Sequence, residues 1–145
     1  MKSVLQRVKT AQVTVDGAVV GAIGPGLLAL VCAEPHDTPE TANRWLNKVL
    51  KLRIFSDDAG KMNRSLTDTQ GGLLLVSQFT LAADCSGGNR PSFSSAAPPD
   101  QARTLYLDLI EQARSRHPQV AAGVFAADMQ VQLINDGPVT IPLNL

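Results

Sequence analysis

The sequence has few of the residues from which metal centres and disulfide frameworks are built. Its two cysteines, Cys32 and Cys85, lie far apart and outside any C-x-x-C spacing, so they predict neither a disulfide framework nor a zinc site. Only two histidines, His36 and His117, are present besides, which leaves few ligands for a metal cluster. This composition suits a reducing compartment and a protein without bound metal.

Long apolar runs are also missing. The longest, Leu27–Ala33, is far shorter than the roughly 18 residues that a membrane-spanning helix requires. Charged residues interrupt the start of the chain before the apolar core of a signal peptide could form. We therefore expect a soluble, cytoplasmic protein that does not bind membranes.

The sequence also lacks a net charge. Thirteen basic residues balance thirteen acidic ones, so a polyanionic partner would have to be held by a local patch and not by the overall field. This balance argues against a general nucleic-acid binder. With 145 residues, of which 44% are hydrophobic and 18% charged, we expect one compact domain covering residues 1–145.

The first part of the chain has the pattern of an antiparallel sheet. β-Branched residues alternate over Val4–Val8 and Gln12–Val15, and Asp16-Gly17 is typical of a tight hairpin turn before a return strand. Gly24-Pro25-Gly26 predicts a further turn, after which Leu27–Ala33 is expected to form a second, buried strand.

Two amphipathic helices are expected to pack on this sheet. Thr38 before Pro39 is typical of a helix start, and the apolar residues that follow recur on one face. Trp45 lies in the middle of that apolar stripe, so we interpret it as a core residue and not as a base-stacking platform. A second helix is predicted from Pro98 until His117.

The centre of the chain joins a buried strand to a polar cluster. The apolar run Leu73–Val76 leads directly into Ser77, Gln78 and Thr80, which predicts that these polar residues lie at a strand end. In α/β and α+β proteins, the residues that carry the chemistry often lie at strand ends. A polar group left unpaired there would cost about 1–3 kcal/mol, so each is either satisfied structurally or directed at a ligand. This stretch alone leaves both interpretations open.

A glycine- and serine-rich segment, Asp84–Ser95, follows and is too long for a hairpin. Its composition is that of a flexible surface loop, but Arg90 beside Pro91 and the aromatic Phe93 favour a role in binding. Cys85 is a poor candidate for a nucleophile, because no neighbouring histidine would activate its thiol.

A Ser-His-Asp triad would need Ser77 as the nucleophile and His36 or His117 as the base. The sequence contains no G-x-S-x-G element, and His117 occupies a helix-ending position. We therefore do not favour a triad hydrolase.

The last part of the chain predicts a strand and a turn. Met129–Ile134 alternates strictly, which is typical of a half-exposed strand. Gly137-Pro138 stands between two strand-like segments and predicts a turn, and its peptide bond has some chance of being cis. In the first strand, Arg7 is flanked by apolar residues, so it is either an edge charge extending to solvent or a cation directed into a site.

Four motifs connect these features: Ser77-Gln78-Phe79-Thr80-Leu81, Asn89-Arg90-Pro91-Ser92-Phe93, Gly123–Met129, and Asn135-Asp136-Gly137-Pro138-Val139-Thr140. With these motifs in this order, the sequence resembles the D-aminoacyl-tRNA deacylase family over essentially its whole length. The stretch Cys85–Gly88 is the loosest part of the match and bears only on local loop contacts.

The resemblance implies an α+β fold in which a largely antiparallel or mixed, barrel-like sheet packs against two main helices, in a homodimer. It also implies a carboxylic ester hydrolase with no metal or organic cofactor. The substrate would be the ester that joins a D-amino acid, or glycine mischarged on tRNA-Ala, to the 3'-terminal adenosine of a tRNA. The partners would then be aminoacyl-tRNA and a second copy of the chain, with no DNA and no membrane.

The resemblance also assigns roles to residues. The catalytic segment corresponds to Ser77, Gln78, Phe79 and Thr80. A Gly-cis-Pro element, Gly137-Pro138, would enter the partner subunit's active site and reject L-amino acids, while Arg7 would hold that element in place. Phe125 and Met129 would line the pocket of the terminal adenosine. The full set of expected substrate-binding residues is Arg90, Pro91, Ser92, Phe93, Phe125, Met129 and Asn135.

The chemistry implied by this site is simple. The ester lies next to a ribose hydroxyl, a potential nucleophile or base, so the protein mainly has to orient the ester and offer N–H donors to the oxyanion. The amides of Phe79 and Thr80 could be those donors, and the attacking group is Thr80, the ribose hydroxyl or water. Two alternatives from other classes are a non-catalytic RNA- or nucleotide-binding module built on Arg90 and Phe93, and a threonine- or serine-dependent hydrolase of small esters.

Overall fold

The computed structural model describes the whole chain, residues 1–145. In chain order its elements are β1 (Lys2–Val15), β2 (Ala18–Ile23), β3 (Gly26–Cys32), α1 (Pro39–Lys51), β4 (Phe55–Ser56), β5 (Met62–Arg64), α2 (Leu66–Thr69), β6 (Gly72–Ser77), the 3₁₀-helix η1 (Phe79–Ala82), α3 (Pro99–Arg116), β7 (Val120–Ala122) and β8 (Gln130–Asn144).

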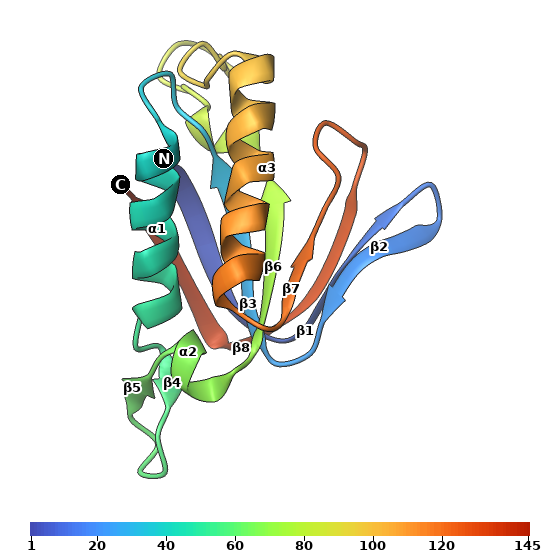
Figure 1. Ribbon diagram of the computed structural model, residues 1–145. Coiled ribbons are helices and arrows are strands. Elements are labelled where there is room, and N and C mark those ends of the chain that lie inside the picture. Colours follow the sequence, from blue (N-terminus) through green and yellow to red (C-terminus); the bar gives the residue numbers. More distant parts are fainter.

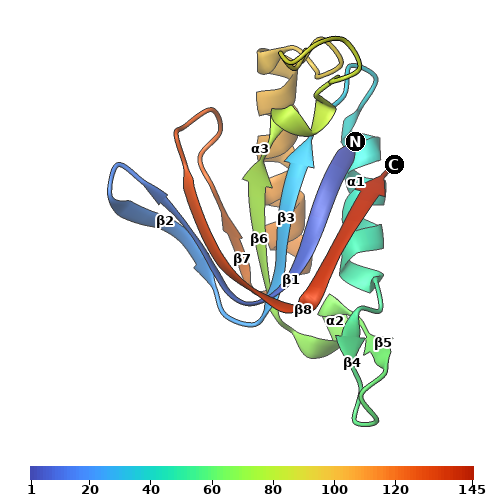
Figure 2. The ribbon, with the colours of Figure 1, turned by 180° about the vertical axis from the view of Figure 1, so that it is seen from behind.

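Strand β1 is the centre of the main sheet. One edge of β1 pairs antiparallel with β8 along almost its full length, while the other edge pairs first with β3, over Lys2–Val8, and then with β2, over Ala11–Val15. The change of partner coincides with slips in the register of β1 against β8, between Gln6 and Thr10. The sheet bends there into two arms, which Figures 1 and 2 show from opposite sides.

The two arms of the sheet close toward each other. The strand order is β2-β1-β3-β6-β7, and a Cβ atom on Gly21 of β2 would lie only 2.7 Å from the carbonyl oxygen of Ala122 in β7. Only glycine permits so close an approach of two backbones. Since β3, β6 and β7 are parallel to one another and the remaining pairs of the sheet are antiparallel, the expected α+β fold with a mixed, barrel-like sheet is confirmed.

Helices α1 and α3 lie side by side on one face of the sheet, and the main core lies beneath them (Figure 1). Alternate residues of β3 and β6 face this core, while Leu28 and Leu74 face a smaller core on the opposite side. Both strands are therefore buried on both faces, which explains their unbroken apolar runs. Trp45 is fully buried and its Nε1 donates to Ser3 Oγ at 2.8 Å, so its prediction as a core residue is confirmed.

Several local predictions are confirmed. Asp16 and Gly17 form the hairpin turn with φ values of 48° and 78°. Thr38 caps α1, accepting a hydrogen bond from Thr41 N at 3.3 Å, and His117 is the C-cap of α3. None of the helices combines the length and the apolar character needed to cross a membrane.

Val4–Val8 and Gln12–Val15 both lie in strand β1, as their alternation predicts. One expectation about a turn is wrong. Gly137-Pro138 does not reverse the chain, since β8 continues past it along β1 and residues 136–139 leave the ladder as a local excursion. The short helix α2 was not predicted, although Ser65 and Asp68 form a capping box at its start.

Candidate active site at the end of strand β6

The polar cluster after β6 lies at the strand end, as the sequence predicts. Ser77 is the last residue of β6, and Gln78 N donates to Val31 O of the neighbouring β3 at 2.7 Å. The chain then turns into η1, where Leu81 N donates to Gln78 O at 3.2 Å. The N–H groups of Phe79 and Thr80, which precede that bond, donate to no acceptor in the chain. Two adjacent backbone donors are therefore unpaired at two exposed residues.

The side chains of this segment form a small network of their own. Gln78 Nε2 donates to Thr80 Oγ1 at 2.6 Å, and no histidine or carboxylate contacts that hydroxyl. The ring of His117 instead hydrogen-bonds to the Gly71 carbonyl, just before β6 begins, and His36 is exposed between β3 and α1. The structure thus assembles no Ser-His-Asp triad here.

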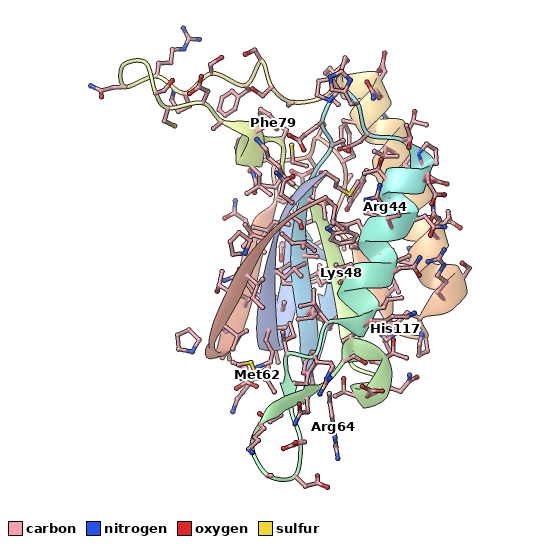
Figure 3. All side chains as sticks on the ribbon, turned by 90° about the vertical axis from the view of Figure 1, so that its left-hand side faces the viewer. Arg44, Lys48, Met62, Arg64, Phe79 and His117 are labelled. Carbon is pink, nitrogen blue, oxygen red and sulfur yellow. The ribbon has the colours of Figure 1, made fainter.

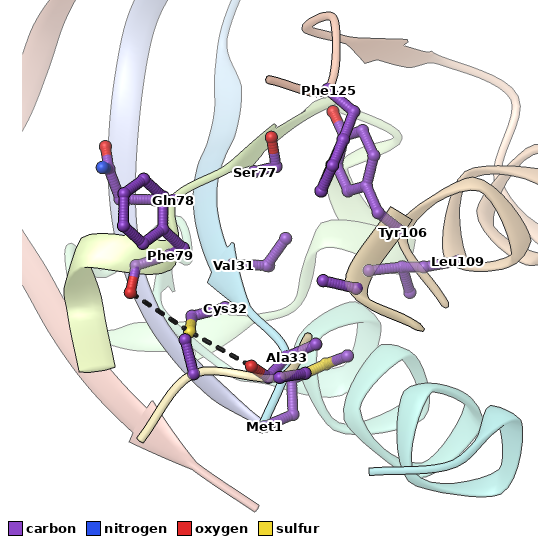
Figure 4. A pocket seen from close by; sticks show the side chains of 13 residues that line it. Met1, Val31, Cys32, Ala33, Ser77, Gln78, Phe79, Tyr106, Leu109 and Phe125 are labelled. Carbon is purple, nitrogen blue, oxygen red and sulfur yellow. Dashed lines mark hydrogen bonds between the residues drawn. The ribbon is translucent and has the colours of Figure 1, made fainter. Parts of the chain in front are cut away.

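A small, mostly apolar cavity lies beside the strand end. Its volume is about 30 Å³, and Figure 4 shows Ser77, Tyr106 and Phe125 around it. Because about 10–15 Å³ of such space is enough for one water molecule, this cavity has room for a few waters and not for a nucleoside. Cys32 also borders it, with Sγ 3.6 Å from the Phe79 carbonyl oxygen. Burial, and next the charge of Glu34, raises the pKa of this thiol, which makes it a poor nucleophile.

Tyr106 of α3 supports the end of β6 through its hydroxyl group. Its hydroxyl donates to Leu75 O at 2.9 Å and lies 3.2 Å from Gly123 O, so it joins β6 to the segment that follows β7. Burial raises the pKa of this hydroxyl from 10.0 to about 12. The sequence analysis assigned Tyr106 no role in this site, although a buried phenol usually needs a hydrogen-bond partner. Its ring also lies beside that of Phe125, with centroids 6.0 Å apart.

The loop after η1 folds back on the same site. Asp84 and Ser92 exchange two backbone hydrogen bonds of 2.7 and 2.9 Å, and Phe93 packs edge-on against Phe79 with ring centroids 5.0 Å apart. The hydrogen bonds from Ser86 lower the pKa of the Asp84 carboxyl, which caps the start of the loop. The structure therefore brings Phe93 against Phe79 and pairs Ser92 with Asp84, while Arg90 and Pro91 are exposed farther along the loop.

A second group of expected residues surrounds Arg7. In the register of β1 against β8, Gln6 pairs with Thr140 and Val8 with Asn135, so the four residues Asp136–Val139 stand opposite Arg7 alone. Arg7 Nε donates to Asp136 O at 2.9 Å and Nη1 donates to Ile54 O at 2.7 Å. Arg7 is thus fixed by two carbonyls and is not a solvated edge charge.

Asn135 closes the excursion Asp136–Val139 at its base. Its Oδ1 accepts from Val139 N at 2.7 Å and its Nδ2 donates to Val139 O at 3.2 Å. Within the excursion, the Gly137-Pro138 bond is cis, and both residues are exposed. Gly137 has a φ of +153°, and a Cβ on it would lie 2.7 Å from Val139 Cγ2, so a larger residue does not fit.

The two groups of residues lie far apart within one chain. Arg7 pairs with Leu27, whereas Ser77 pairs with Val31, and four residues of strand span about 13 Å. Strands β8 and β6 are also three positions apart, which adds about 14 Å across the sheet. Met129 packs with the smaller core and does not line the cavity that Phe125 borders.

Comparison with known proteins points to one family. A family model described as D-Tyr-tRNA(Tyr) deacylase matches residues 4–144. The D-aminoacyl-tRNA deacylase of Methylibium petroleiphilum is 66% identical over 143 residues, which cover 99% of this chain and 94% of that protein. The D-aminoacyl-tRNA deacylase of Delftia acidovorans is 63% identical over 150 residues, which cover 100% of this chain and 96% of that protein.

Solved structures share the fold. A protein named c-Myc DNA Unwinding Element Binding Protein has a TM-score of 0.94 and 42% identity, with 100% of this chain and 99% of that chain covered. A probable eukaryotic D-amino acid tRNA deacylase has a TM-score of 0.86 and 17% identity, with 99% of this chain and 98% of that chain covered. At that identity the second likeness shows the fold alone.

Proposed function

The chain belongs to the D-aminoacyl-tRNA deacylase family, and on that premise we propose how its residues divide the reaction between them. Family membership makes it a hydrolase of the ester between a D-amino acid and tRNA. We infer that it also releases glycine mischarged on tRNA-Ala, and that it acts in the cytoplasm, where tRNAs are charged.

The observation that carries the catalytic proposal is the pair of unpaired N–H groups of Phe79 and Thr80. When a nucleophile adds to the ester carbonyl, the carbonyl oxygen becomes an oxyanion, and fixed N–H donors stabilise it without having to reorganise. The adduct then collapses: the bond to the ribose oxygen breaks, that oxygen takes up a proton, and the D-amino acid leaves.

The attacking group in this proposal is water. Thr80 Oγ1 accepts its hydrogen bond from the amide of Gln78, which cannot remove the hydroxyl proton, so Thr80 lacks a base that would make it a nucleophile. The ribose hydroxyl next to the ester is well placed to take the proton from water and pass it to the leaving oxygen. Gln78 and Thr80 would then position the ester, and Ser77 lines the small cavity beneath it.

The terminal adenosine is assigned to the apolar surface around η1. Phe79 and Phe93 have 56% and 38% of their surfaces exposed, which is unusual for large apolar residues and offers ring faces to a base. Phe125, which lines the same cavity as Phe79, would extend this surface, and Arg90, Pro91 and Ser92 would complete it from the loop. Met129 packs toward the smaller core and would support this surface from behind, beside Gly123. The cavity of about 30 Å³ is the floor of the site and not the adenosine pocket itself.

Chiral selection is proposed to come from a second copy of the chain. Gly137-Pro138 lies at the opposite end of the sheet from Ser77 in its own chain, so it cannot complete its own site. In a twofold dimer each copy can instead place this exposed element in the other's site. Arg7 and Asn135 hold the element from both sides, as a rigid probe of the substrate requires. Asn135 is thus assigned to supporting the element, and only indirectly to substrate binding.

A backbone element suits this selection better than a side-chain pocket. A pocket shaped for one side chain could not accept chemically varied D-amino acids, whereas backbone atoms behind Cα would exclude any L side chain and still admit glycine. Carbonyl oxygens of the element would accept hydrogen bonds from the α-ammonium group of the substrate.

The test is to incubate the protein with D-aminoacyl-tRNA, glycyl-tRNA-Ala and L-aminoacyl-tRNA and to measure the released amino acid. Release from the first two and not from the third is expected. Release from none would contradict the activity, and equal release from all would contradict the chiral selection. Hydrolysis of simple aryl esters at comparable kcat/KM would favour the small-ester hydrolase instead.

One observation favours the non-catalytic alternative, which is the likeness of this chain to a protein named c-Myc DNA Unwinding Element Binding Protein. A gel-shift assay with single-stranded DNA and with tRNA distinguishes it. Tight DNA binding without ester hydrolysis would support a binding module.

A further inference from the structure

The outward face of α1 carries a row of cations. Arg44, Lys48 and Lys51 follow one another at helical spacing, and Arg53 stands just beyond the C-cap Leu52. All four cations, which we name the α1 basic stripe, are exposed and line one open groove. Figure 3 shows Arg44 and Lys48 along α1, below the end of the sheet that bears Phe79.

No carboxylate forms an ion pair with any of the four residues of the α1 basic stripe. Arg53 is held in place by neutral groups, donating to Asn63 O at 3.0 Å and to Asn63 Oδ1 at 2.7 Å. Arg116 of α3 lies beside this groove, because it donates to Oδ1 of Asn47, a lining residue, at 3.0 Å. Five of the thirteen basic residues of a neutral protein are thus concentrated on this face.

Helix stability explains only part of this arrangement. Lys48 and Lys51 lie in the last turn of α1, where cations favourably face the unpaired carbonyls of a helix end. Arg44 is a full turn earlier and Arg53 lies outside the helix, so neither has that role. An ordinary solvated helix face would also mix charges of both signs, but Glu40 is the one acid in α1.

We propose that the α1 basic stripe binds the phosphate backbone of the tRNA beyond its terminal adenosine. This inference rests on the function proposed above. Helix α1 begins shortly after β3, whose end pairs with Ser77, and Arg44 lies five residues into the helix, or about 8 Å along it. From Arg44 to Lys51 the stripe extends about 10 Å. A tRNA whose end lies at η1 can therefore continue along α1.

The charge of the molecule explains why such a stripe would be needed. A protein with no net charge has no overall attraction for a polyanion, so a local row of unpaired cations has to supply it. Each phosphate contact releases condensed counterions, and the logarithm of affinity falls with that of salt by about 0.7 to 0.9 per contact.

The experiment compares two triple variants with the parent protein. The stripe variant carries Arg44→Gln, Lys48→Gln and Lys51→Gln, which keep good helix formers in place. The control removes three exposed charges elsewhere, with Lys61→Gln, Arg103→Gln and Arg114→Gln. The kcat/KM of each protein is measured between 50 and 200 mM salt on D-aminoacyl-tRNA and on D-aminoacyl-adenosine, which lacks the phosphate backbone.

On D-aminoacyl-tRNA, the advantage of the parent over the stripe variant should be about 20- to 40-fold larger at 50 mM than at 200 mM salt, since three contacts are lost. On D-aminoacyl-adenosine, all three proteins should be equal. A stripe variant that matches the control on tRNA would overturn the proposal, and so would an equal loss on both substrates. The proposal would also be overturned if the stripe variant kept the parental kinetics on tRNA but lost a parental ability to bind anionic lipid vesicles. No hydrolysis of either substrate by the parent would instead refute the proposed function.

Discussion

Arg7 donates from its guanidinium Nε to the carbonyl oxygen of Asp136 at 2.9 Å, across 129 residues of chain. The Arg7 side chain is only 11% exposed, and the Asp136 carboxylate lies 3.6 Å from the same nitrogen but is 43% exposed, so solvent screens that ion pair. The carbonyl contact is therefore the specific one. It links the middle of β1 to the start of the excursion that contains Gly137-Pro138.

Arg7→Ala should loosen this excursion. We expect slower hydrolysis of D-aminoacyl-tRNA and weaker rejection of the L-ester, and a loss of about 1.5–3 kcal/mol in the free energy of unfolding, as for hydrogen bonds to charged groups. The measurement is kcat/KM on matched D- and L-substrates with urea unfolding alongside. Arg7→Lys, which keeps the charge but not the two-nitrogen geometry, should fall in between. A folded, dimeric Arg7→Ala protein with unchanged D rate and L rejection would show that the element needs no support.

Phe79→Pro isolates the contribution of a backbone donor. Proline removes the N–H of residue 79, which is the first residue of η1, a position where the fixed φ of proline suits a helical turn. Phe79→Ala is the matched control, because both variants lose the ring and only one loses the N–H. We expect kcat of Phe79→Pro to be about 10²- to 10³-fold below that of Phe79→Ala. Equal kcat values would exclude the Phe79 amide from the oxyanion site.

Thr80→Ala tests whether the hydroxyl is a nucleophile. Because Gln78 Nε2 already occupies that hydroxyl as a donor, we expect kcat to fall no more than about tenfold, whereas loss of a covalent nucleophile costs about 10⁴-fold or more. A parallel substrate ending in 2'-deoxyadenosine should be hydrolysed poorly by the parent protein. Full turnover of that substrate would count against assistance by the ribose hydroxyl.

Mixed dimers test whether each site is built from two chains. Arg7→Ala damages the excursion of one chain and Phe79→Pro damages the strand end of the other. In a mixed dimer, the intact strand end of the first chain would meet the intact excursion of the second. Mixing equal amounts after dissociation should therefore restore about a quarter of the parental activity, with parental rejection of the L-ester. If each site were formed within a single chain, mixing would restore no activity. A fully active monomer in sedimentation would likewise show that the site does not need a second chain.

Tyr106→Phe should reveal a pH-dependent contribution to stability. The pKa of Tyr106 is raised from 10.0 to about 12 by burial, so the folded state keeps its proton where the unfolded state loses it. The stabilisation is fully present below pH 10, falls as pH rises toward 12, and amounts to about 3 kcal/mol. The difference in unfolding free energy between the parent and Tyr106→Phe should accordingly shrink from pH 9 to pH 11. A difference that stays constant would mean that the hydroxyl titrates normally.

The sequence by itself determined the features that depend on residues close together in the chain. The Asp16-Gly17 hairpin, the start of α1 after Thr38 and the polar end of the apolar run at Ser77 all follow from local turn, capping and strand preferences. The ordered motifs that include Ser77–Leu81 were enough to indicate the family, which the comparisons confirm.

Only the tertiary structure decided the relationships between distant segments. The pairing of β8 with β1 turned an expected chain reversal at Gly137-Pro138 into an excursion and placed it against Arg7, and hydrophobic periodicity cannot specify which strands pair. Whether the amides of Phe79 and Thr80 have acceptors depended on where β6 meets β3. The hydroxyl of Tyr106 found its partners on two other segments, because a buried donor takes whichever acceptor the packing brings near.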